Sequence, residues 1–495
     1  MFTFSLNVTT KAGRELITSF SLSVNTYDKI ALIGEEGNGK SLFLKALTNN
    51  IDETNLNVSK NLSNTTLLFG YMKQELSTTA LQQTLYDFAL DYQWEKYHKF
   101  LSLMHQLLPH LTESDYHRKL SSFSGGECVR IQLLKVALMR ADVYIFDEPT
   151  NNLDLETIVW FESWLLSLTE PVLFVSHDTH LIRNTANRIL HFEQLSRKSK
   201  SRITLFEGSY DDFHTTRSRM ISHHNNVADN QMREREKQQQ RWQQQYNKVS
   251  HQLRHVARND PGLQKKMKNL KAQKRRFERC SDLSHIETES PVIINPQGIQ
   301  TITTRHLFKF DLPELLIESK RLATALTLSM TTTDRIACIG NNGSGKTTFI
   351  HYLNTFTKTL PFRTAILHQD IHQCINLNES PLDNCVIDGS KEERESIAAA
   401  LGGLRFTSEE MTTPLNQLSG GQRTKTALLK ILRQDPDLLI LDEPTRNLSP
   451  DSVAEVVRVL KAFPKAIFCV THDRAFISEL FPTCITLTPM GFKLM

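Results

Sequence analysis

Long hydrophobic runs are missing from this sequence of 495 residues, of which 39% are hydrophobic and 23% charged. No apolar stretch approaches the roughly 18 to 20 residues that a membrane-spanning helix needs, so we expect no membrane partner. The first twenty residues lack a basic segment followed by an apolar one, which argues against a secretory signal. We therefore expect a cytoplasmic protein.

Cysteine is scarce as well. The chain has 7 cysteines, an odd number, and no two of them are spaced as CxxC. This pattern argues against a disulfide framework and against a zinc or iron–sulfur site. We expect reduced thiols with a structural role.

A strong overall charge is also absent, because the formal net charge is only +4. The basic residues are nevertheless concentrated in one place. Residues 215–285 hold 17 Lys and Arg against 6 Asp and Glu, whereas the rest of the chain holds 41 against 48. A polyanionic partner is therefore expected for this segment and not for the whole surface.

An internal repeat organises the rest of the chain. The phosphate loop GEEGNGKS at Gly34–Ser41 returns as GNNGSGKT at Gly340–Thr347. FSGGE, DEPT and VSHD of the first copy return as LSGGQ, DEPT and VTHD, each 295 positions later. The motifs keep their order, which indicates two collinear copies of one domain.

Each copy has the pattern of an α/β domain. YDKIALIG and TDRIACIG are short apolar runs that lead into the phosphate loops, and helical patterns follow them. ADVYIFDEP and PDLLILDEP are continuous apolar runs, as expected for strands buried on both faces of a mainly parallel sheet. We predict one copy of this α/β domain at residues 1–207 and the other at residues 291–495, with a linker at 208–290.

The linker has a different composition. From about Tyr210 to Val256 it is polar and rich in glutamine, without proline or glycine, and NDPG at Asn259–Gly262 interrupts it. Good helix formers without a broad apolar face predict two long helices, joined at a tip near residues 254–263. The first helix would reach roughly 70 Å at about 1.5 Å per residue. A solvated coiled-coil hairpin that only joins the domains is the alternative.

The phosphate loops predict nucleotide binding. A GxxxxGK[ST] loop between a strand and a helix holds phosphates on its backbone N–H groups and on the helix N-terminus. Lys40 and Lys346 would contact the β- and γ-phosphates. Ser41 and Thr347 would offer hydroxyl groups to Mg²⁺.

Paired acids end a strand in both copies. Asp147 and Asp442 would hold Mg²⁺ through water, and the glutamates after them would polarise the attacking water. Other candidates are a histidine after a later strand and a glutamine before the paired acids, which would contact the γ-phosphate, the metal or the water. The predicted catalytic residues are Glu148, Glu443, His177, His472, Gln74 and Gln369.

The phosphate loop, the glutamine, SGGE or SGGQ, DEPT and the histidine, in this order, resemble the nucleotide-binding domain of the ATP-binding cassette (ABC) superfamily. This resemblance implies two composite sites, in which the phosphate loop of one copy and the Ser-Gly-Gly segment of the other enclose one ATP. The first composite site would join Gly34, Gly37, Gly39, Lys40, Ser41, Gln74, Asp147, Glu148 and His177 to Ser419, Gly420, Gly421 and Gln422. The second would join Gly340, Gly343, Gly345, Lys346, Thr347, Gln369, Asp442, Glu443 and His472 to Ser124, Gly125, Gly126 and Glu127.

Two cassettes without membrane segments, joined by a charged helical linker, resemble the ABC-F family of translation factors. The resemblance implies a monomer whose two domains close on ATP. It also implies that the linker enters the 70S ribosome and contacts 23S rRNA and P-site tRNA. A housekeeping translation factor and a DNA-associated ABC ATPase are alternative functions, since a basic linker suits any nucleic acid.

The two DEPT motifs continue differently. Asn-Leu-Asp follows in the first copy, ending at Asp154, and Asn-Leu-Ser-Pro follows in the second, with Ser449 in place of the acid. The second form resembles the antibiotic-resistance subgroup of ABC-F proteins, which displace drugs from the peptidyl-transferase region. We expect the two ATP sites to be inequivalent.

Two departures from the family pattern bear on nucleotide binding. Glu35 and Glu36 place acids inside the first phosphate loop, which would weaken nucleotide binding there. No aromatic residue is clearly placed to stack on adenine. Phe4 and Phe310 are the candidates.

Overall fold

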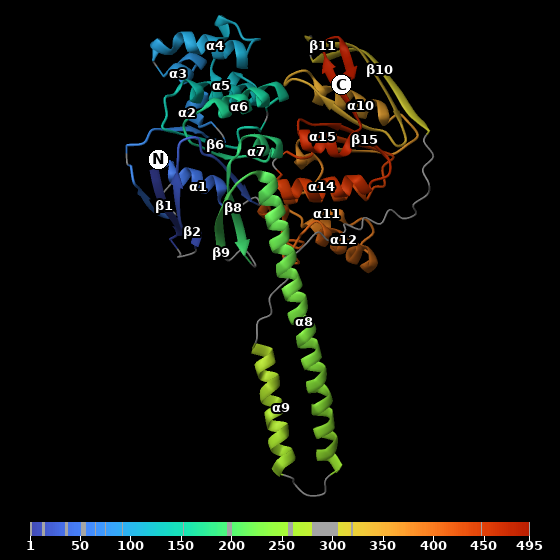
Figure 1. The fold of residues 1–495 in the computed structure, drawn as a ribbon. Coiled ribbons are helices and arrows are strands. Elements are labelled where there is room, and N and C mark those ends of the chain that lie inside the picture. Colours follow the sequence, from blue (N-terminus) through green and yellow to red (C-terminus); the bar gives the residue numbers. More distant parts are fainter. Residues whose placement is uncertain are drawn as a thin grey trace. The chain divides into compact units, whose positions relative to one another are not determined.

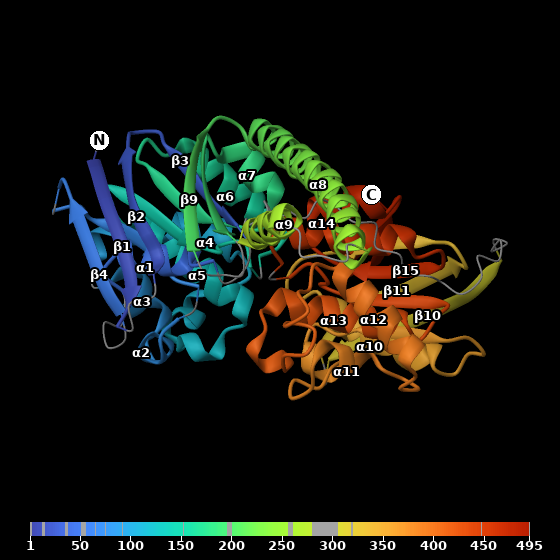
Figure 2. The same ribbon diagram turned by 90° about the horizontal axis from the view of Figure 1, so that it is seen from below.

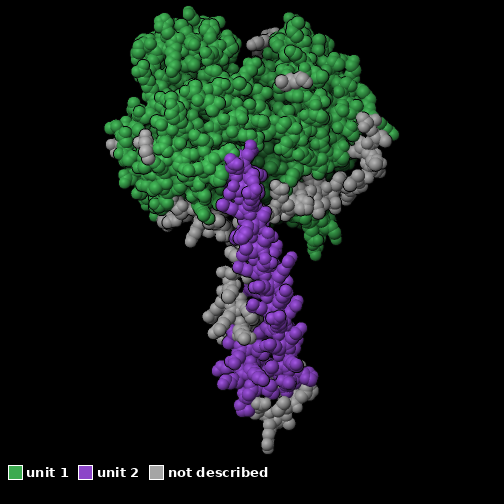
Figure 3. Space-filling model, in the orientation of Figure 1, with its two compact units in different colours: residues 1–210, 292–495 green, residues 211–291 purple. Residues whose placement is uncertain are grey.

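The computed structural model describes residues 2–11, 15–34, 38–50, 56–64, 66–74, 76–91, 93–151, 153–195, 200–255, 261–279, 305–317, 320–446 and 448–494. The chain forms two compact units, shown in different colours in Figure 3. One comprises residues 1–210, the amino-terminal half, together with residues 292–495, the carboxyl-terminal half. The other is the linker unit, residues 211–291.

The amino-terminal half is built on a six-stranded sheet of order β5-β6-β7-β3-β8-β9. Its strands are parallel except for β9, which pairs antiparallel with β8. All six residues of β3 are buried, as are all five of β6, because helices cover both faces of the sheet. The strands are β3 (Lys29–Gly34), β5 (Phe69–Met72), β6 (Val143–Asp147), β7 (Val172–Val175), β8 (Arg188–Leu195) and β9 (Lys200–Glu207).

The carboxyl-terminal half repeats this topology in the order β13-β14-β15-β12-β16-β17. Only β17 is antiparallel to its neighbour. The strands are β12 (Arg335–Ile339), β13 (Thr364–Leu367), β14 (Leu438–Asp442), β15 (Ala466–Val470), β16 (Thr483–Thr488) and β17 (Gly491–Leu494). The same topology in both halves confirms the predicted tandem α/β fold.

A small antiparallel sheet accompanies each large sheet. The amino-terminal half has the order β2-β1-β4, whose strands lie side by side in Figure 2, and the carboxyl-terminal half has the hairpin β10-β11. The strands are β1 (Phe2–Thr10), β2 (Glu15–Val24), β4 (Leu56–Leu62), β10 (His306–Ile317) and β11 (Lys320–Thr331).

The helices surround the sheets, as Figure 1 shows for each half. In the amino-terminal half they are α1 (Lys40–Leu47), α2 (Thr78–Leu81), α3 (Leu85–Leu90), α4 (Tyr97–Leu107), α5 (Gly125–Leu138), α6 (Leu155–Ser167) and α7 (Thr179–Thr185). In the carboxyl-terminal half they are α10 (Lys346–Thr357), α11 (Pro381–Cys385), α12 (Lys391–Gly403), α13 (Gly420–Leu432), α14 (Pro450–Ala462) and α15 (Arg474–Leu480). Short 3₁₀ turns are η1 (Trp94–Lys96), η2 (Glu113–His117), η3 (Leu120–Ser122), η4 (Ile371–Gln373) and η5 (Leu415–Gln417).

Apolar side chains of the strands and helices form the cores of the two halves. Phe43 of α1 packs edge-on against Phe192 of β8, and both are almost fully buried. Phe349 of α10 occupies the equivalent place and packs against Phe468 of β15. Burial of each such side chain contributes roughly 1.5–3 kcal/mol. These contacts hold the helix after each phosphate loop against the central sheet.

The linker unit is a helical hairpin. Its helices are α8 (Tyr210–His255) and α9 (Pro261–Arg279), and the 46 residues of α8 correspond to roughly 70 Å. The Trp242 indole N–H donates a hydrogen bond of 2.8 Å to the carbonyl oxygen of Leu270, and its ring stacks on Tyr246. Trp242 thus fastens α8 to α9. Of the predicted tip, residues 256–260 lie outside the described residues.

Two further observations concern the predictions from composition. In the part of the chain that the structure describes, no helix has both the length and the apolar character needed to cross a membrane. The cysteines in this part are free thiols, and Cys280 lies outside it.

Candidate functional site

The phosphate loops lie between a buried strand and a helix in both halves. Lys40 and Lys346 begin α1 and α10, and each ammonium donates a 2.7 Å hydrogen bond to a carbonyl oxygen of its own loop, Gly34 or Gly340. Gly345 has a φ of 97°. This φ favours glycine, because other residues are strained there, and a Cβ atom would also come within 2.7 Å of the end of the Leu322 side chain. Gly37 lies outside the described residues.

The aspartates that end β6 and β14 lie next to the hydroxyl residues of the loops. The Ser41 hydroxyl donates a 2.8 Å hydrogen bond to Asp147, and the Thr347 side chain is bonded to Asp442. Burial raises the pKa of both aspartates, that of Asp442 to about 6. One buried oxygen of each, Oδ2 of Asp147 and Oδ1 of Asp442, makes no hydrogen bond within the described residues.

The glutamates after these aspartates have an unusual backbone conformation. Glu148 has a φ of 53° and Glu443 a φ of 51°, in the left-handed region that non-glycine residues rarely adopt. Each is held there by its own N–H, which donates to the carbonyl oxygen of Val175 or Val470 on the neighbouring strand. Strain of this kind costs roughly 1–3 kcal/mol and persists where the fold requires it, often at functional sites.

The two glutamates differ in their surroundings. Three side chains contact the Glu148 carboxylate: Gln74 at 3.0 Å, Asn151 at 2.6 Å and His177 at 3.4 Å. Burial opposes its ionisation, but the contacts with His177 and Asn151 and the charge of Lys40 outweigh burial, so the pKa of Glu148 is lowered. Glu443 lies 3.6 Å from His472, and burial raises its pKa. Burial, with the charge of Lys346, lowers the pKa of His472 to about 3.

The Ser-Gly-Gly segments form helix N-termini of the same design. Ser124 caps α5 and Ser419 caps α13, each in a capping box with the residue three positions later. That residue is Glu127 in the first copy and Gln422 in the second. Such boxes satisfy N–H groups of the first turn and aim the remaining ones outward, where an anion can bind.

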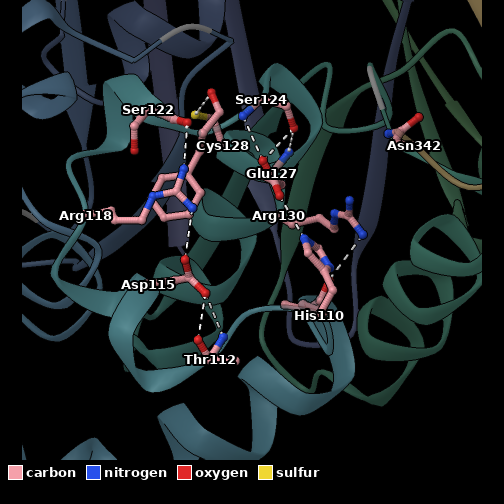
Figure 4. Close-up of polar contacts among 12 residues, drawn as sticks. His110, Thr112, Asp115, Arg118, Ser122, Ser124, Glu127, Cys128, Arg130 and Asn342 are labelled. Atoms are coloured by element: carbon pink, nitrogen blue, oxygen red, sulfur yellow. Dashed lines mark hydrogen bonds and ion pairs between the residues drawn. The ribbon is translucent and has the colours of Figure 1, made fainter. Parts of the chain in front are cut away.

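Residues predicted for the second composite site surround one cavity of about 930 Å³. This volume lies within the range of roughly 300–1,000 Å³ typical of ligand pockets. The carboxyl-terminal half contributes Gly343, Gly345, Lys346, Thr347, Gln369, Asp442, Glu443 and His472, and the amino-terminal half contributes Ser124, Gly125, Gly126 and Glu127. Figure 4 shows the amino-terminal wall of this site. The structure therefore brings these residues together, whereas Gly340, which was also predicted for this site, is not among the residues that line the cavity.

The contacts described above for the first composite site stay within the amino-terminal half. Gln74 and His177 meet at Glu148, and Ser41 meets Asp147. The pairing of this group with Ser419–Gln422 stays a prediction.

The set of donors fits ATP and a small hard cation. Asp147 and Asp442 each offer a buried carboxylate oxygen that no described residue hydrogen-bonds, beside a hydroxyl group and a loop lysine. Mg²⁺ prefers oxygen ligands and commonly takes only one or two from the protein, with water and phosphate completing the octahedron. No cluster of three or more His, Cys, Asp or Glu in the described part of the chain could hold a metal by itself.

Sequence comparison decides the family. A profile of the ABC transporter family matches residues 17–151 and 323–446, which are more than half of the chain. The chain belongs to the ABC transporter family. One matched segment lies within each α/β domain, so this protein is a tandem ABC protein. It is an ATPase whose ABC domains bind ATP.

Three known proteins illustrate the similarity. ATP-binding protein Uup of Buchnera aphidicola is 27% identical, over 94% of this chain and 77% of Uup. Human ATP-binding cassette sub-family F member 3 is 27% identical over 72% of this chain and 48% of its own length. The archaeal ribosome recycling factor aABCE1, solved with the ribosomal stalk protein aP1, has a TM-score of 0.62 at 16% identity, over 96% of this chain and 87% of that chain.

The residues that follow DEPT differ in structure between the two ABC domains. Asp154 caps α6, lies 3.5 Å from the buried guanidinium of Arg130, and accepts a 3.5 Å hydrogen bond from the N–H of Asn342 in the second phosphate loop. Ser449, its counterpart, caps α14 through the N–H of Ser452. The Asp154 carboxylate thus joins the first DEPT segment to the phosphate loop of the other half.

The residue that corresponds to Arg130 in the second copy makes a different contact. Lys425 occupies the equivalent position on α13, and its ammonium lies 2.5 Å from the buried carboxylate of Glu455 on α14. Arg405 pairs with the same carboxylate at 2.9 Å. With serine at position 449, the basic residue of α13 is held inside its own domain.

Sequence reasoning missed several residues of this ABC site. Arg130, Asn342, His110 and Arg446 line the cavity, and Arg474 crosses between the halves to Glu162 and Asp178. None of them belongs to a motif that recurs unchanged, since Arg130 aligns with Lys425 and His110 with Arg405. Comparing the two copies position by position for charged residues that differ would have found both.

The two candidates for adenine stacking are wrong. Phe4 is 2% exposed and Phe310 7%, and they pack against Phe43 and Phe349 in the cores. A ring buried in this way has no face free for a base. Ile317, at the end of β10, lines the cavity instead and is 44% exposed.

Proposed function

We propose that this tandem ABC ATPase is a cytoplasmic, ATP-dependent ribosome-binding protein of the ABC-F kind, acting as a monomer. The linker hairpin would enter the 70S ribosome and contact 23S rRNA and P-site tRNA. The observation that carries the proposal is the charge of the hairpin. Helix α9 alone holds eight Lys and Arg against one acid, Glu278, and its lysines Lys265, Lys266 and Lys268 are exposed.

The known proteins agree with this proposal. One of them is named as a member of sub-family F, and the solved structure is named as a ribosome recycling factor. The roughly 70 Å length of α8 is on the scale of the path that the linker would follow into the ribosome.

At the second composite site, we propose that Lys346 and the N–H groups of its loop bind the β- and γ-phosphates, with Ser124–Glu127 closing the site. Thr347 and Asp442 would hold Mg²⁺, which would neutralise charge on the phosphates. Glu443 would polarise the attacking water and accept its proton, Gln369 would contact the metal or this water, and His472 would contact the γ-phosphate. Ser41, Asp147, Glu148, His177 and Gln74 would have the same roles at the first site.

Closure of the two halves on ATP would set the affinity for the ribosome. ATP contacts both halves at each composite site, so it favours the closed form by its difference in affinity for the two forms. Hydrolysis removes the γ-phosphate contacts and releases the halves.

The basic hairpin gives the test. In the variant, Lys265, Lys266 and Lys268 of α9 are replaced by glutamine. The control carries the same change at Lys11, Lys391 and Lys493, which are exposed on the ATPase unit. Each lost phosphate contact lowers the slope of log affinity against log salt by about 1. We expect ribosome binding with a slope lower by about 3 for the α9 variant and unchanged for the control; equal slopes would overturn the proposal.

We further propose that ribosome binding displaces antibiotics from the peptidyl-transferase region. The support is the Asp-to-Ser change at position 449, followed by Pro450, which resembles the resistance subgroup. Expression in a susceptible bacterium should raise the inhibitory concentrations of lincosamide, pleuromutilin and streptogramin A drugs. Unchanged values with intact ribosome binding would favour a housekeeping translation factor, and retention on duplex DNA without ribosome binding would favour a DNA-associated ATPase.

A further inference from the structure

An acid and an imidazole meet at the wall of the second composite site. Glu127 Oε2 accepts two 2.8 Å hydrogen bonds, from the N–H and from the hydroxyl group of Ser124. Its other oxygen, Oε1, lies 2.7 Å from Nε2 of His110. Figure 4 shows His110 pointing at Glu127, which in turn contacts Ser124. The carboxylate is thus held between the Ser-Gly-Gly segment and a histidine that no motif contains.

The other copy lacks this arrangement. Gln422, which is neutral, replaces Glu127 in its capping box. The repeat aligns Arg405 with His110, and the Arg405 guanidinium is engaged with Glu455. The acid and its titratable partner therefore belong to one composite site only.

The position of Glu127 poses an electrostatic problem for a nucleotide site. Glu127 and His110 both line the cavity that Lys346 and Thr347 also line. A polyphosphate bound there would face an ionised carboxylate at the segment expected to close over it. Burial raises the pKa of Glu127, but the contacts with His110 and Ser124 outweigh burial and leave the pKa lowered, so the carboxylate stays charged. Such a charge must be balanced for an anion to bind tightly.

His110 is placed to balance it. Its side chain is 50% exposed and therefore accessible to solvent, whereas that of Glu127 is 19% exposed. A protonated imidazole bonded to the carboxylate makes the pair neutral, and a neutral imidazole leaves a net negative charge. Histidine is the side chain whose charge ordinarily changes near neutral pH.

We propose that His110 is a positioning residue of the second composite site, whose protonated imidazole neutralises Glu127 and so permits Ser124–Glu127 to close on the nucleoside triphosphate. Binding of the triphosphate at this site is then tighter at lower pH. The first composite site, with Gln422, has no such dependence. This inference rests on the proposed pairing of Ser124–Glu127 with the second phosphate loop.

Other charged groups around the cavity also contribute to its pH dependence. Beyond the proposed metal ligand Asp442 and the proposed catalytic residues Glu443 and His472, they are Arg130 on α5, His177 and Asp178 after β7, Lys346 on α10, Arg446 after β14 and Asp473 after β15. All of them remain when Glu127 or His110 is replaced. A comparison of variants at two pH values therefore isolates the pair.

The test measures the Kd of Mg-ATP by calorimetry in the full chain at about pH 6 and about pH 8, on either side of the ordinary histidine pKa. A Lys40→Ala background disables the first phosphate loop. The variants are Glu127→Gln, which copies the other half, His110→Gln, which keeps a hydrogen-bond donor without the charge, and the double variant. Protonation of ATP itself affects all of them equally.

We expect the Kd to rise from about pH 6 to about pH 8 when both residues are intact. The ratio of the two Kd values should be about tenfold larger than in Glu127→Gln, which corresponds to about 1.4 kcal/mol. His110→Gln should bind weakly at both pH values. In the Glu127→Gln background, His110→Gln should change the Kd less than about twofold, because there is no charge left to balance.

Three outcomes would overturn the assignment. The first is the same ratio of Kd values in all variants, and the second is an equal effect of His110→Gln with and without Glu127. The third is loss of folding in His110→Gln, detected as a lowered Tm that Glu127→Gln does not rescue, since this would show a structural role. If Mg-ATP binds at neither pH even with His110 and Glu127 intact, the proposed nucleotide site itself fails, and ribosome binding can be scored separately.

Discussion

Replacing Asp154 by asparagine should weaken both the fold and the second ATP site. Asparagine keeps the size of the side chain and also caps helices well, so the start of α6 is preserved. What is lost is the charge that lies 3.5 Å from the Arg130 guanidinium. Burial raises the pKa of Asp154, but the Thr157 hydrogen bond and Arg130 outweigh it, so the group is ionised in the folded protein.

The size of the effect follows from this geometry. Two unit charges at this distance attract by about 5 kcal/mol at an effective dielectric constant of about 20. Arg130 is 7% exposed and Asp154 3% exposed, so solvent replaces little of the lost interaction. The asparagine oxygen still accepts a hydrogen bond, which leaves a net destabilisation of about 2–3 kcal/mol. For a domain of this size, the Tm should fall by about 4–12 °C.

The assay combines thermal unfolding with steady-state ATP hydrolysis. The KM for ATP should rise in Asp154→Asn, because the N–H of Asn342 in the opposite phosphate loop loses a charged acceptor. Ser449→Ala is the matched control in the other half: it removes a helix cap worth about 1 kcal/mol and no charge. If Asp154→Asn unfolds at the same temperature as the unmodified protein, with the same KM, the reasoning about the buried pair is refuted.

Three other predictions concern single side chains. Lys425→Met should lower the stability by about 3 kcal/mol, because it leaves the buried carboxylate of Glu455 with one partner. The control Lys461→Met, which breaks an exposed ion pair, should lower the stability by at most about 1 kcal/mol. Equal shifts in Tm would contradict this prediction. Trp242→Ala should make the linker hairpin more sensitive to protease and leave ATP hydrolysis unchanged, because the indole fastens α8 to α9; an unchanged cleavage rate would count against that contact. His472→Asn should make nucleotide-free protein less sensitive to acid. The pKa of His472 is about 3 in the folded protein and near 6.5 ordinarily, so the stability that this residue contributes at neutral pH is lost as the pH falls below about 6.5. The drop in Tm between about pH 7.5 and about pH 5 measures this loss and should be smaller in the variant.

The sequence predicted those features that depend on local pattern. Continuous apolar runs ending in acids predicted β6 and β14, and the glycine-rich loops predicted the starts of α1 and α10. The repeat then predicted that both halves share one topology. Each of these features is recorded in neighbouring residues, so no knowledge of packing was needed.

Features that depend on packing could not be predicted in this way. The left-handed conformation of Glu148 and Glu443 arises from hydrogen bonds to a neighbouring strand. The contact of Asp154 with Asn342 joins residues almost 190 positions apart. Phe4 was only a candidate for adenine stacking, and its burial in the core depends on packing that the sequence does not record.

The most direct test of the central claim is co-sedimentation with ribosomes of a variant that binds ATP without hydrolysing it. Glu148→Gln with Glu443→Gln removes the proposed water-activating carboxylates of both sites and keeps the phosphate loops. With ATP present, this variant should pellet with 70S ribosomes, and it should stay in the supernatant when ADP replaces ATP. Failure to pellet with ATP, in a preparation shown to bind ATP, would contradict the account.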